Sequence, residues 1–474
     1  MVWRYHAIPI GEAWRKGSDA YQNLIRVLMF AVRKFRQGVN LMLNRKRMFI
    51  ICGVVLMALP MFVLSHAVYA QTEVQFWSNF GTPATSEFMR VLIKAFEQEQ
   101  PDIKVVHRAI PDDMLYSTVR NALLGNDPPE IVQHDGYQQV RDYAQAGVIM
   151  DLTDWWESHE DRFVPAARGS NNEYGGRVYS VPWTLVVGNP VFYNVRMLEE
   201  AGLEPPQTWD EFVEIMEDFK SRGIDPIGFG NKEGWPGMQW WMQFLLQTCG
   251  ADKVNALMAR DEPGMAPKWT DPDVVRSAEY YVDLFRSGYF SVGATSNDYQ
   301  TGAALFMAER TPFFHAGSFF LQLDFPPALE WDWFEFPRIE TEPHGLGKKD
   351  IIMSFLYNFS VTERSQNKEA ALKFLEFMTR PEWAREWVRL VKSNVAVQDG
   401  NTPDVMSDQA YRLMELLGPA TGYVPFLDGN LPPTVGEDKI YNGSMAVLTG
   451  EMTPEEWMKS IEDAHNRAIS DTVD

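Results

Sequence analysis

Aromatic residues beside turns and strand ends give this sequence its clearest binding chemistry. The 474-residue chain has 16 tryptophans, and all but Trp3 and Trp14 lie after residue 70. Sugars present apolar C–H faces and hydroxyl groups, so their sites combine flat aromatic rings with a few polar groups. Trp77 and Asn79 follow residues of strand character, and Trp235 stands in the sequence 234–237, which indicates an exposed loop. These three residues are candidates for such a site, although Trp77 is explained equally well as a cover for a sheet edge.

Other aromatic and acidic residues extend the candidate set. Trp240 and Trp241 begin the next predicted helix on different faces, so at least one is expected in the core, and Trp240 is kept as a candidate. Asp428, in the turn-like segment 426–429, is a further candidate. Tryptophans at helical spacing or beside helix starts are expected to pack rather than bind. They are Trp155, Trp156, Trp209, Trp383, Trp387 and Trp457.

No catalytic motif accompanies these residues. The sequence lacks a GxSxG elbow, an HExxH helix and a P-loop, and its histidines are scattered. A glycosidase needs two carboxylates across one bond, but residues 71–474 contain 62 acidic residues, so no pair stands out. Cys52 and Cys249, the two cysteines, show no metal-ligand spacing. The sequence therefore assigns no catalytic residue, no metal and no cofactor.

Charge is distributed unevenly along the chain. Residues 1–70 hold 10 basic and 2 acidic residues, whereas residues 71–474 hold 33 basic and 62 acidic residues, a net charge of −29. Such an acidic body repels phosphate backbones and anionic lipid, which excludes nucleic acid as a partner. An anionic ligand is disfavoured for the same reason unless a local arginine overrides it.

Residues 45–70 have the order of an export signal. Basic residues 45–47 precede the apolar run 48–65, and Ala67–Ala70 give a small-residue cleavage pattern. We expect cleavage after Ala70 and a periplasmic protein. The run is also near the minimum length of a membrane helix, so a retained anchor is the alternative. Residues 1–44 are explained either by a start codon assigned too early or by a basic amphipathic helix.

Strand and helix patterns alternate after residue 70. Strands are predicted at 74–77, 103–106 and 130–133, and helices at 86–98, 115–124 and 142–148. This order is typical of βαβ units with a mostly parallel sheet covered on both faces. Thr208 and Glu211 form a capping box that predicts a helix to residue 222. Residues 273–286 predict another helix, and the last third is mainly helical.

Several segments, in this order, resemble the carbohydrate-binding members of the solute-binding proteins of ABC importers, the group that includes maltose-binding protein. The resemblance spans about residues 73–467. Its segments are 76–77, 129–132, 143–147, 151–153, 176–182, 193–194, 201–203, 206–212, 302–307, 316–319, 369–378, 381–382 and 448–451. Each segment is short, and their collinear order carries the resemblance.

The resemblance implies a two-lobed α/β fold, the type II periplasmic-binding-protein fold. Mostly parallel sheets flanked by helices would form two lobes with a ligand cleft between them. The N-terminal lobe would comprise residues 71–183 plus 338–358, and the C-terminal lobe residues 188–335 plus 361–474. Residues 1–70 would form the N-terminal extension and signal peptide.

The resemblance also adds site residues. Asp135 stands where the family places a cleft residue, with a plain Asp-Gly turn as the alternative. Trp183 stands at the first expected crossing between lobes, where hinge packing is the alternative. Ser318 and Phe319 match a segment that carries a stacking aromatic in the family.

The implied function is capture of a mono- or oligosaccharide and its delivery to the permease subunits of an ABC importer. The chain would act as a monomer, without a cofactor and without enzymatic activity. An exported glycan hydrolase or lyase is the alternative from another class, because a cleft with aromatics and carboxylates would serve either task. A membrane-tethered sugar sensor is the third hypothesis.

Overall fold

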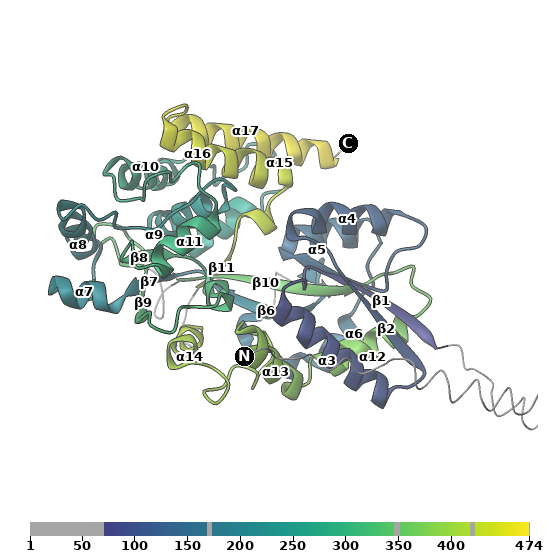
Figure 1. Cartoon of the computed structure of the whole chain (residues 1–474). Helices are drawn as coiled ribbons and strands as arrows, with labels where there is room; N and C mark the ends of the chain where they lie inside the picture. Colours follow the sequence, from purple (N-terminus) through teal and green to yellow (C-terminus); the bar gives the residue numbers. More distant parts are fainter. Residues whose placement is uncertain (1–70, 168–172, 346–350, 418–421, 474) are drawn as a thin grey trace, which may run out of the picture. The chain divides into compact units, whose positions relative to one another are not determined.

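The computed structural model describes residues 71–474 except 168–172, 346–350, 418–421 and 474 (Figure 1). The chain divides into two compact units, Met1–Ala70 and Gln71–Asp474, and the description concerns the second. The predicted export signal lies outside the described residues. Within the described ranges, no helix combines the length and apolar character needed to cross a membrane.

A mainly parallel sheet forms the first half of the described unit. Its strands follow the order β11-β10-β3-β1-β2, and β6 pairs with β10. Strands β1 (Thr72–Ser78), β2 (Ile103–Ala109) and β3 (Ile131–Asp135) are parallel neighbours. Val74 and Phe76 are fully buried and alternate with partly buried residues, as the period-two pattern requires. The expected α/β fold with a mostly parallel central sheet is confirmed.

Helices cover both faces of this sheet. Figure 1 shows α4 and α5 on one face and α3, α12 and α13 on the other. The helices are α3 (Pro83–Glu99), α4 (Asp112–Leu124), α5 (Gly136–Gln145), α6 (Thr153–Glu157), α12 (Lys368–Met378) and α13 (Pro381–Val391). A short hairpin, β4 (Glu173–Tyr174) and β5 (Arg177–Val178), follows α6.

Two long strands connect the halves of the unit. They are β6 (Val181–Val187) and β10 (Ile351–Val361), which pair antiparallel (Figure 1). The start of β10 pairs with β11 (Gly422–Pro425), and its end pairs with β3. Every residue of β6 is buried. These paired strands therefore connect the two halves.

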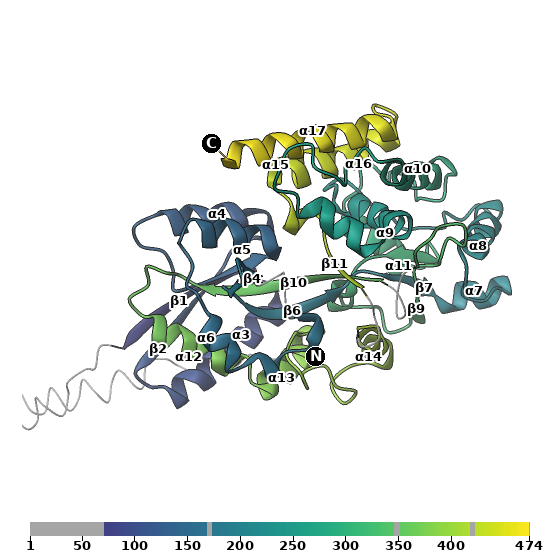
Figure 2. The same ribbon diagram turned by 180° about the vertical axis from the view of Figure 1, so that it is seen from behind.

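The other half holds a small antiparallel sheet and most of the long helices. The sheet has the order β8-β7-β9, with β7 (Pro190–Asn194), β8 (Phe313–His315) and β9 (Trp331–Glu335). Figure 2 shows α15, α16 and α17 on the same half as α9 and α10. The helices are α7 (Val195–Ala201), α8 (Trp209–Ser221), α9 (Trp235–Met258), α10 (Pro272–Arg286), α11 (Tyr299–Met307), α14 (Asp408–Glu415), α15 (Pro433–Val435), α16 (Asn442–Thr449) and α17 (Pro454–Val473). Short 3-10 or π turns are η3 (Ser318–Gln322), η4 (Asp428–Asn430) and η5 (Gly436–Tyr441).

Local sequence signals account for several helix boundaries. The capping box at the start of α8 is confirmed, because Thr208 accepts from the Glu211 N–H and Glu211 accepts from the Thr208 N–H. Helix α9 begins at Trp235, before the predicted start at Trp240, and bends at Gly250, whose φ is 76°. A Cβ there would lie 2.7 Å from the His344 ring, so only glycine allows this close packing.

The contacts of two segments differ from the lobe division expected above. Helices α12 and α13, in the segment assigned to the C-terminal lobe, contact α3. Conversely, Arg338 bridges to Thr208 and the Ile339 N–H donates to Gln247, both on the C-terminal side. We therefore propose that α12 and α13 belong to the N-terminal lobe and that residues 338–345 belong to the C-terminal lobe.

Candidate functional site

The carboxyl ends of β1 and β3 place three of the predicted residues at one sheet edge. Trp77 is paired with Val132 across β1 and β3, Asn79 follows β1, and Asp135 ends β3. The Asn79 backbone N–H donates to Gln133 Oε1 at 3.1 Å, which holds the chain after β1 against β3. Ligands bind at the carboxyl edge of open α/β sheets. This polar edge is the N-terminal half of the candidate site.

Three partly exposed rings gather in the C-terminal half. We call Trp235, Tyr299 and Phe319 the aromatic platform. The ring centroids of Trp235 lie 4.7 Å from Tyr299 and 5.7 Å from Phe319, and those of Tyr299 and Phe319 are 5.9 Å apart. None of the three is fully buried, unlike most large rings of this half. Part of the surface of each of these three residues therefore remains exposed.

Helix starts hold the platform in place. Trp235 is the first residue of α9, with Pro236 in its first turn, so segment 234–237 is a helix start and not the predicted loop. Tyr299 is the first residue of α11, whose cap is Asp298 accepting from the Thr301 N–H. Phe319 lies in η3, and its neighbour Ser318 accepts from the Val187 N–H at 3.1 Å. Ser318 therefore anchors η3 to β6.

Tyr299 was missed by the sequence analysis. Its hydroxyl is buried and has no hydrogen-bond partner among the described residues, and burial raises the pKa of the phenol. The local signal was present, because Asp298 and Thr301 mark a helix N-terminus and place Tyr299 at its first position. Nothing local connects that position with Trp235, 64 positions earlier in the numbering.

Two predicted site tryptophans lie in the core instead. Trp183 is fully buried against Phe88 and Trp387, with ring centroids 5.9 and 5.5 Å away. Trp240 is 1% exposed and packs edge-on against His315. Both indole rings are covered by protein, so neither offers a face to a ligand in this structure. The packing alternatives explain both positions.

Asp428 and the Asp135-Gly136 turn lie where the two lobes touch. Asp428 Oδ2 accepts from the Tyr441 hydroxyl at 2.6 Å, so part of this carboxylate serves the local structure. Gly136, at the start of α5, has φ 79°, and a Cβ there would lie 2.4 Å from the Gly429 carbonyl oxygen. The turn therefore requires glycine for conformation and for close approach of η4.

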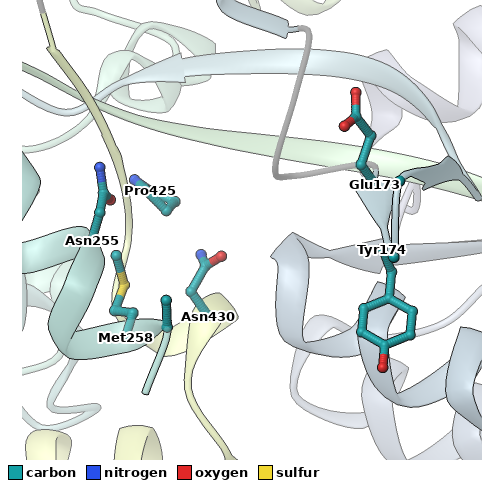
Figure 3. Close-up of a pocket in the computed structure, with 9 residues that line it drawn as sticks. Glu173, Tyr174, Asn255, Met258, Pro425 and Asn430 are labelled. Atoms are coloured by element: carbon teal, nitrogen blue, oxygen red, sulfur yellow. The ribbon is translucent and has the colours of Figure 1, made fainter. Parts of the chain in front are cut away.

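A groove of about 490 Å³ also opens between the two halves. Figure 3 shows Asn255, Met258, Pro425 and Asn430 on one side, with Glu173 and Tyr174 opposite them. Its lining includes no residue of the aromatic platform and none of the predicted site residues. The groove and the platform are therefore separate features.

Four histidines stay in the neutral form: His134, His315 and His465, which are buried, and His107, which is partly buried. Burial lowers the pKa of His107 to about 4, of His134 to about 3 and of His315 to about 4. Burial together with the Arg260 guanidinium lowers the pKa of His465 to about 4. His134 Nε2 lies 2.8 Å from Ser360 Oγ, and His315 Nδ1 lies 2.8 Å from the Pro190 carbonyl oxygen. These contacts are structural.

The described residues bring no metal-binding group of three or more His, Cys, Asp or Glu together. Cys249 is buried, and burial raises the pKa of its thiol to about 12. The described residues do offer a cluster of three partly exposed rings in the C-terminal half and a polar sheet edge in the N-terminal half. Sites for ligands with an apolar face and a hydroxyl-bearing rim combine features of these two kinds.

Comparisons with known proteins give the family and the fold. Residues 81–385 match the family described as bacterial extracellular solute-binding protein. The multiple sugar-binding protein of Streptococcus mutans is 27% identical over 334 residues, covering 66% of this chain and 74% of that protein. An ABC transporter extracellular-binding protein of Pyrococcus horikoshii, PH1039, is 30% identical over 218 residues, and the match spans about half of each chain, 45% and 49%. A solved structure of a chitin oligosaccharide binding protein has a TM-score of 0.73 at 21% identity, covering 84% of this chain and 99% of that one.

Proposed function

The chain belongs to the bacterial extracellular solute-binding proteins, and from this premise we propose that it captures a saccharide and delivers it to the permease of an ABC importer. The aromatic platform is the observation that carries the proposal. Three partly exposed rings in mutual contact form a surface that fits the C–H face of a pyranose. The names of relatives such as the multiple sugar-binding protein support the same ligand class.

The polar edge supplies the second half of the proposed site. Asn79 and Asp135 stand at the carboxyl ends of β1 and β3, the edge at which open α/β sheets bind ligands, and both are proposed as ligand contacts. Ser318 acts indirectly, by fixing the segment that bears Phe319. Asp428 and Trp77 complete the set of proposed ligand contacts. Saccharide binding in this proposal therefore requires residues of both lobes.

We propose that no bond of the saccharide is broken. The four histidines with lowered pKa values stay uncharged near neutral pH, because those values lie near 3 to 4, so none of them is a general acid at that pH. The platform itself carries only rings, one phenol and no carboxylate. Its chemistry is recognition, consistent with membership of a solute-binding family.

Export and assembly complete the proposal. We propose that the protein acts as a monomer in the periplasm after cleavage behind Ala70, and that closed, saccharide-loaded lobes dock on the permease. N-terminal sequencing of the exported protein checks the cleavage. An intact apolar segment at 48–65 would favour the membrane-tethered sensor instead.

A thermal-shift screen over mono- and oligosaccharides tests the proposed function. A ligand present at a hundred times its Kd stabilises the native state by about 2.7 kcal/mol, so a true ligand raises the melting temperature clearly. We expect one saccharide class to do so, in proportion to its concentration. Failure of every saccharide, or release of shortened products during incubation, would contradict saccharide capture.

A further inference from the structure

Arg108, beside the polar edge, makes no ion pair within the described part of the chain, unlike the other cations that lie over aromatic rings there. Arg108 of β2 is in register with Trp77 of β1, and each is the penultimate residue of its strand. Paired residues of parallel strands project from the same face of the sheet, here at its carboxyl end. The Arg108 guanidinium carbon lies 4.4 Å from the centroid of the Trp77 ring.

The described residues contain three other cations over aromatic rings, and each of them also pairs with a carboxylate. Arg380 lies over Phe377 and pairs with Glu99. Arg412 lies over Trp333 and pairs with Asp332, and Lys220 lies over Tyr289 and pairs with Glu217. The Arg108 side chain is exposed and makes neither an ion pair nor a hydrogen bond within the described part of the chain.

The absence of an ion pair at Arg108 among the described residues is unexpected in so acidic a protein. Residues 71–474 carry 62 acidic and 33 basic residues, so carboxylate partners are abundant. A guanidinium over an aromatic ring uses its flat face, and its N–H groups at the edge stay available for a planar, bidentate partner. Within the described part of the chain, the N–H groups of Arg108 beside Trp77 therefore remain available to a ligand.

We propose that Arg108 binds a carboxylate of the ligand, so that the captured solute is a uronate-containing saccharide. This inference rests on the proposed function, whose saccharide site it makes more specific. The overall negative charge does not oppose it, because charges beyond about 8 Å are screened at physiological ionic strength. The nearby Arg108 guanidinium then attracts the ligand carboxylate despite the negative net charge of the protein.

The experiment compares acidic saccharides with their neutral methyl esters. Digalacturonate, dimannuronate and glucuronosyl-xylobiose, each beside its ester, and glucose 1-phosphate are titrated by calorimetry at pH 7 against wild type, Arg108→Gln and Arg108→Lys. We expect wild type to bind one acid at least tenfold more tightly than its ester. Arg108→Gln should remove that difference and leave the affinity for the ester within twofold, while Arg108→Lys should retain part of it.

Lys104→Gln is the matched control. It removes the same charge from the same strand, at its other end, where Lys104 pairs with Glu73 at 3.5 Å. Its affinities should equal those of wild type.

Three results would each overturn the assignment of Arg108. Wild type binds acid and ester equally, Arg108→Gln loses affinity for both equally, or glucose 1-phosphate is preferred over every uronate in an Arg108-dependent way. If only neutral saccharides bind, the proposed function stands and the uronate inference fails. If no saccharide of any class binds, the proposed function itself fails.

Discussion

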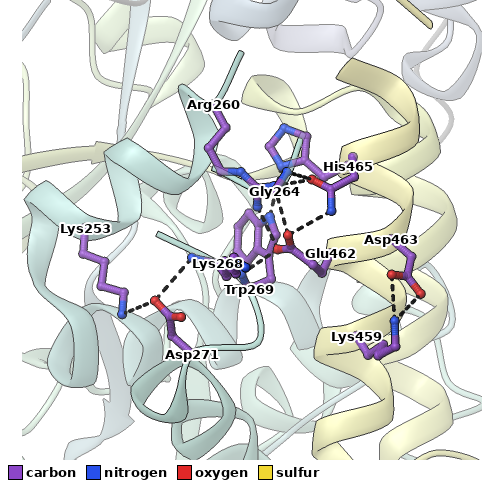
Figure 4. Close-up of polar contacts among 11 residues, drawn as sticks. Lys253, Arg260, Gly264, Lys268, Trp269, Asp271, Lys459, Glu462, Asp463 and His465 are labelled. Carbon is purple, nitrogen blue, oxygen red and sulfur yellow. Dashed lines mark hydrogen bonds and ion pairs between the residues drawn. The ribbon is translucent and has the colours of Figure 1, made fainter. Parts of the chain in front are cut away.

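Trp235 and Trp269 occupy similar places in the sequence but have opposite surroundings. Each lies at or just before the start of a helix, α9 for Trp235 and α10 for Trp269. Trp235 is partly exposed, and its ring contacts are with Tyr299 and Phe319. Trp269 is fully buried, its backbone N–H donates to Glu462 Oε2, and its indole N–H donates to His465 Nδ1 (Figure 4).

A polar network explains why Trp269 is fixed. We call Arg260, Trp269, Glu462, His465 and Asn466 the Arg260 cluster. Arg260 binds Glu462 through two hydrogen bonds of 2.7 and 3.0 Å, and the two side chains are 1% and 9% exposed. The cluster joins the segment after α9 to α17 (Figure 4). A tryptophan with covered faces and a bonded N–H, such as Trp269, is therefore a packing residue, whereas the partly exposed Trp235 is the one that we propose as a ligand contact.

Breaking the Arg260 cluster should have the largest effect. Glu462→Gln leaves the buried Arg260 charge without its counterion, which typically costs about 3–5 kcal/mol of stability. We expect a large fall in the guanidinium midpoint, measured by circular dichroism, with saccharide affinity unchanged in the folded fraction. Lys459→Ala is the control on the same helix, because the exposed Lys459–Asp463 pair should contribute no more than about 1 kcal/mol. Equal effects of the two variants would contradict the assigned role of the cluster.

Removing the Trp235 ring should weaken saccharide binding and change the stability of the fold little. Truncation of an aromatic anchor commonly costs about 2 kcal/mol of binding, so Trp235→Ala should weaken the saccharide about 30-fold. Calorimetry measures the affinity, and the melting temperature should change little because the ring is partly exposed. Trp383→Ala is the control, since Trp383 packs against Phe377 away from the platform. Undiminished affinity in Trp235→Ala would remove the platform from the site.

The change in stability with pH should be smaller than the effects of Glu462→Gln and Trp235→Ala, and part of it should be due to His465. The folded pKa of His465, about 4, lies below its ordinary value of 6.5, so the unfolded chain takes up a proton first as pH falls. The contribution of His465 is fully present above pH 6.5 and is lost between about pH 6.5 and 4, with a slope of at most about 1.4 kcal/mol per pH unit. His465→Gln should flatten this slope by up to that amount, measured by denaturation at pH 5 and pH 7. An unchanged slope would show that His465 does not titrate as a buried neutral group.

Local patterns predicted the fold well where one segment determines its own structure. Thr208 with Glu211 specified the start of α8, and the alternation of Val74 and Phe76 specified β1. The family resemblance supplied what local patterns cannot, namely two lobes around one site.

Long-range packing set the limits of prediction. Whether Trp183, Trp240 or Trp235 has an open face depends on rings far away in sequence, such as Trp387, His315 and Tyr299. The contact of α13 with α3 likewise joins residues about 290 positions apart in the numbering, so the amphipathic pattern of α13 predicts a helix without its partner. The sequence did not indicate a role for Arg108, because the proposed role depends on the pairing of Arg108 with Trp77 across β2 and β1.

The most direct test of saccharide capture is a calorimetric titration with the saccharide that most raises the melting temperature, followed by recovery and chromatography of that saccharide. The account predicts one saccharide bound per chain and complete recovery of the unaltered compound. New reducing ends, or saturable binding that Trp235→Ala leaves intact, would contradict it.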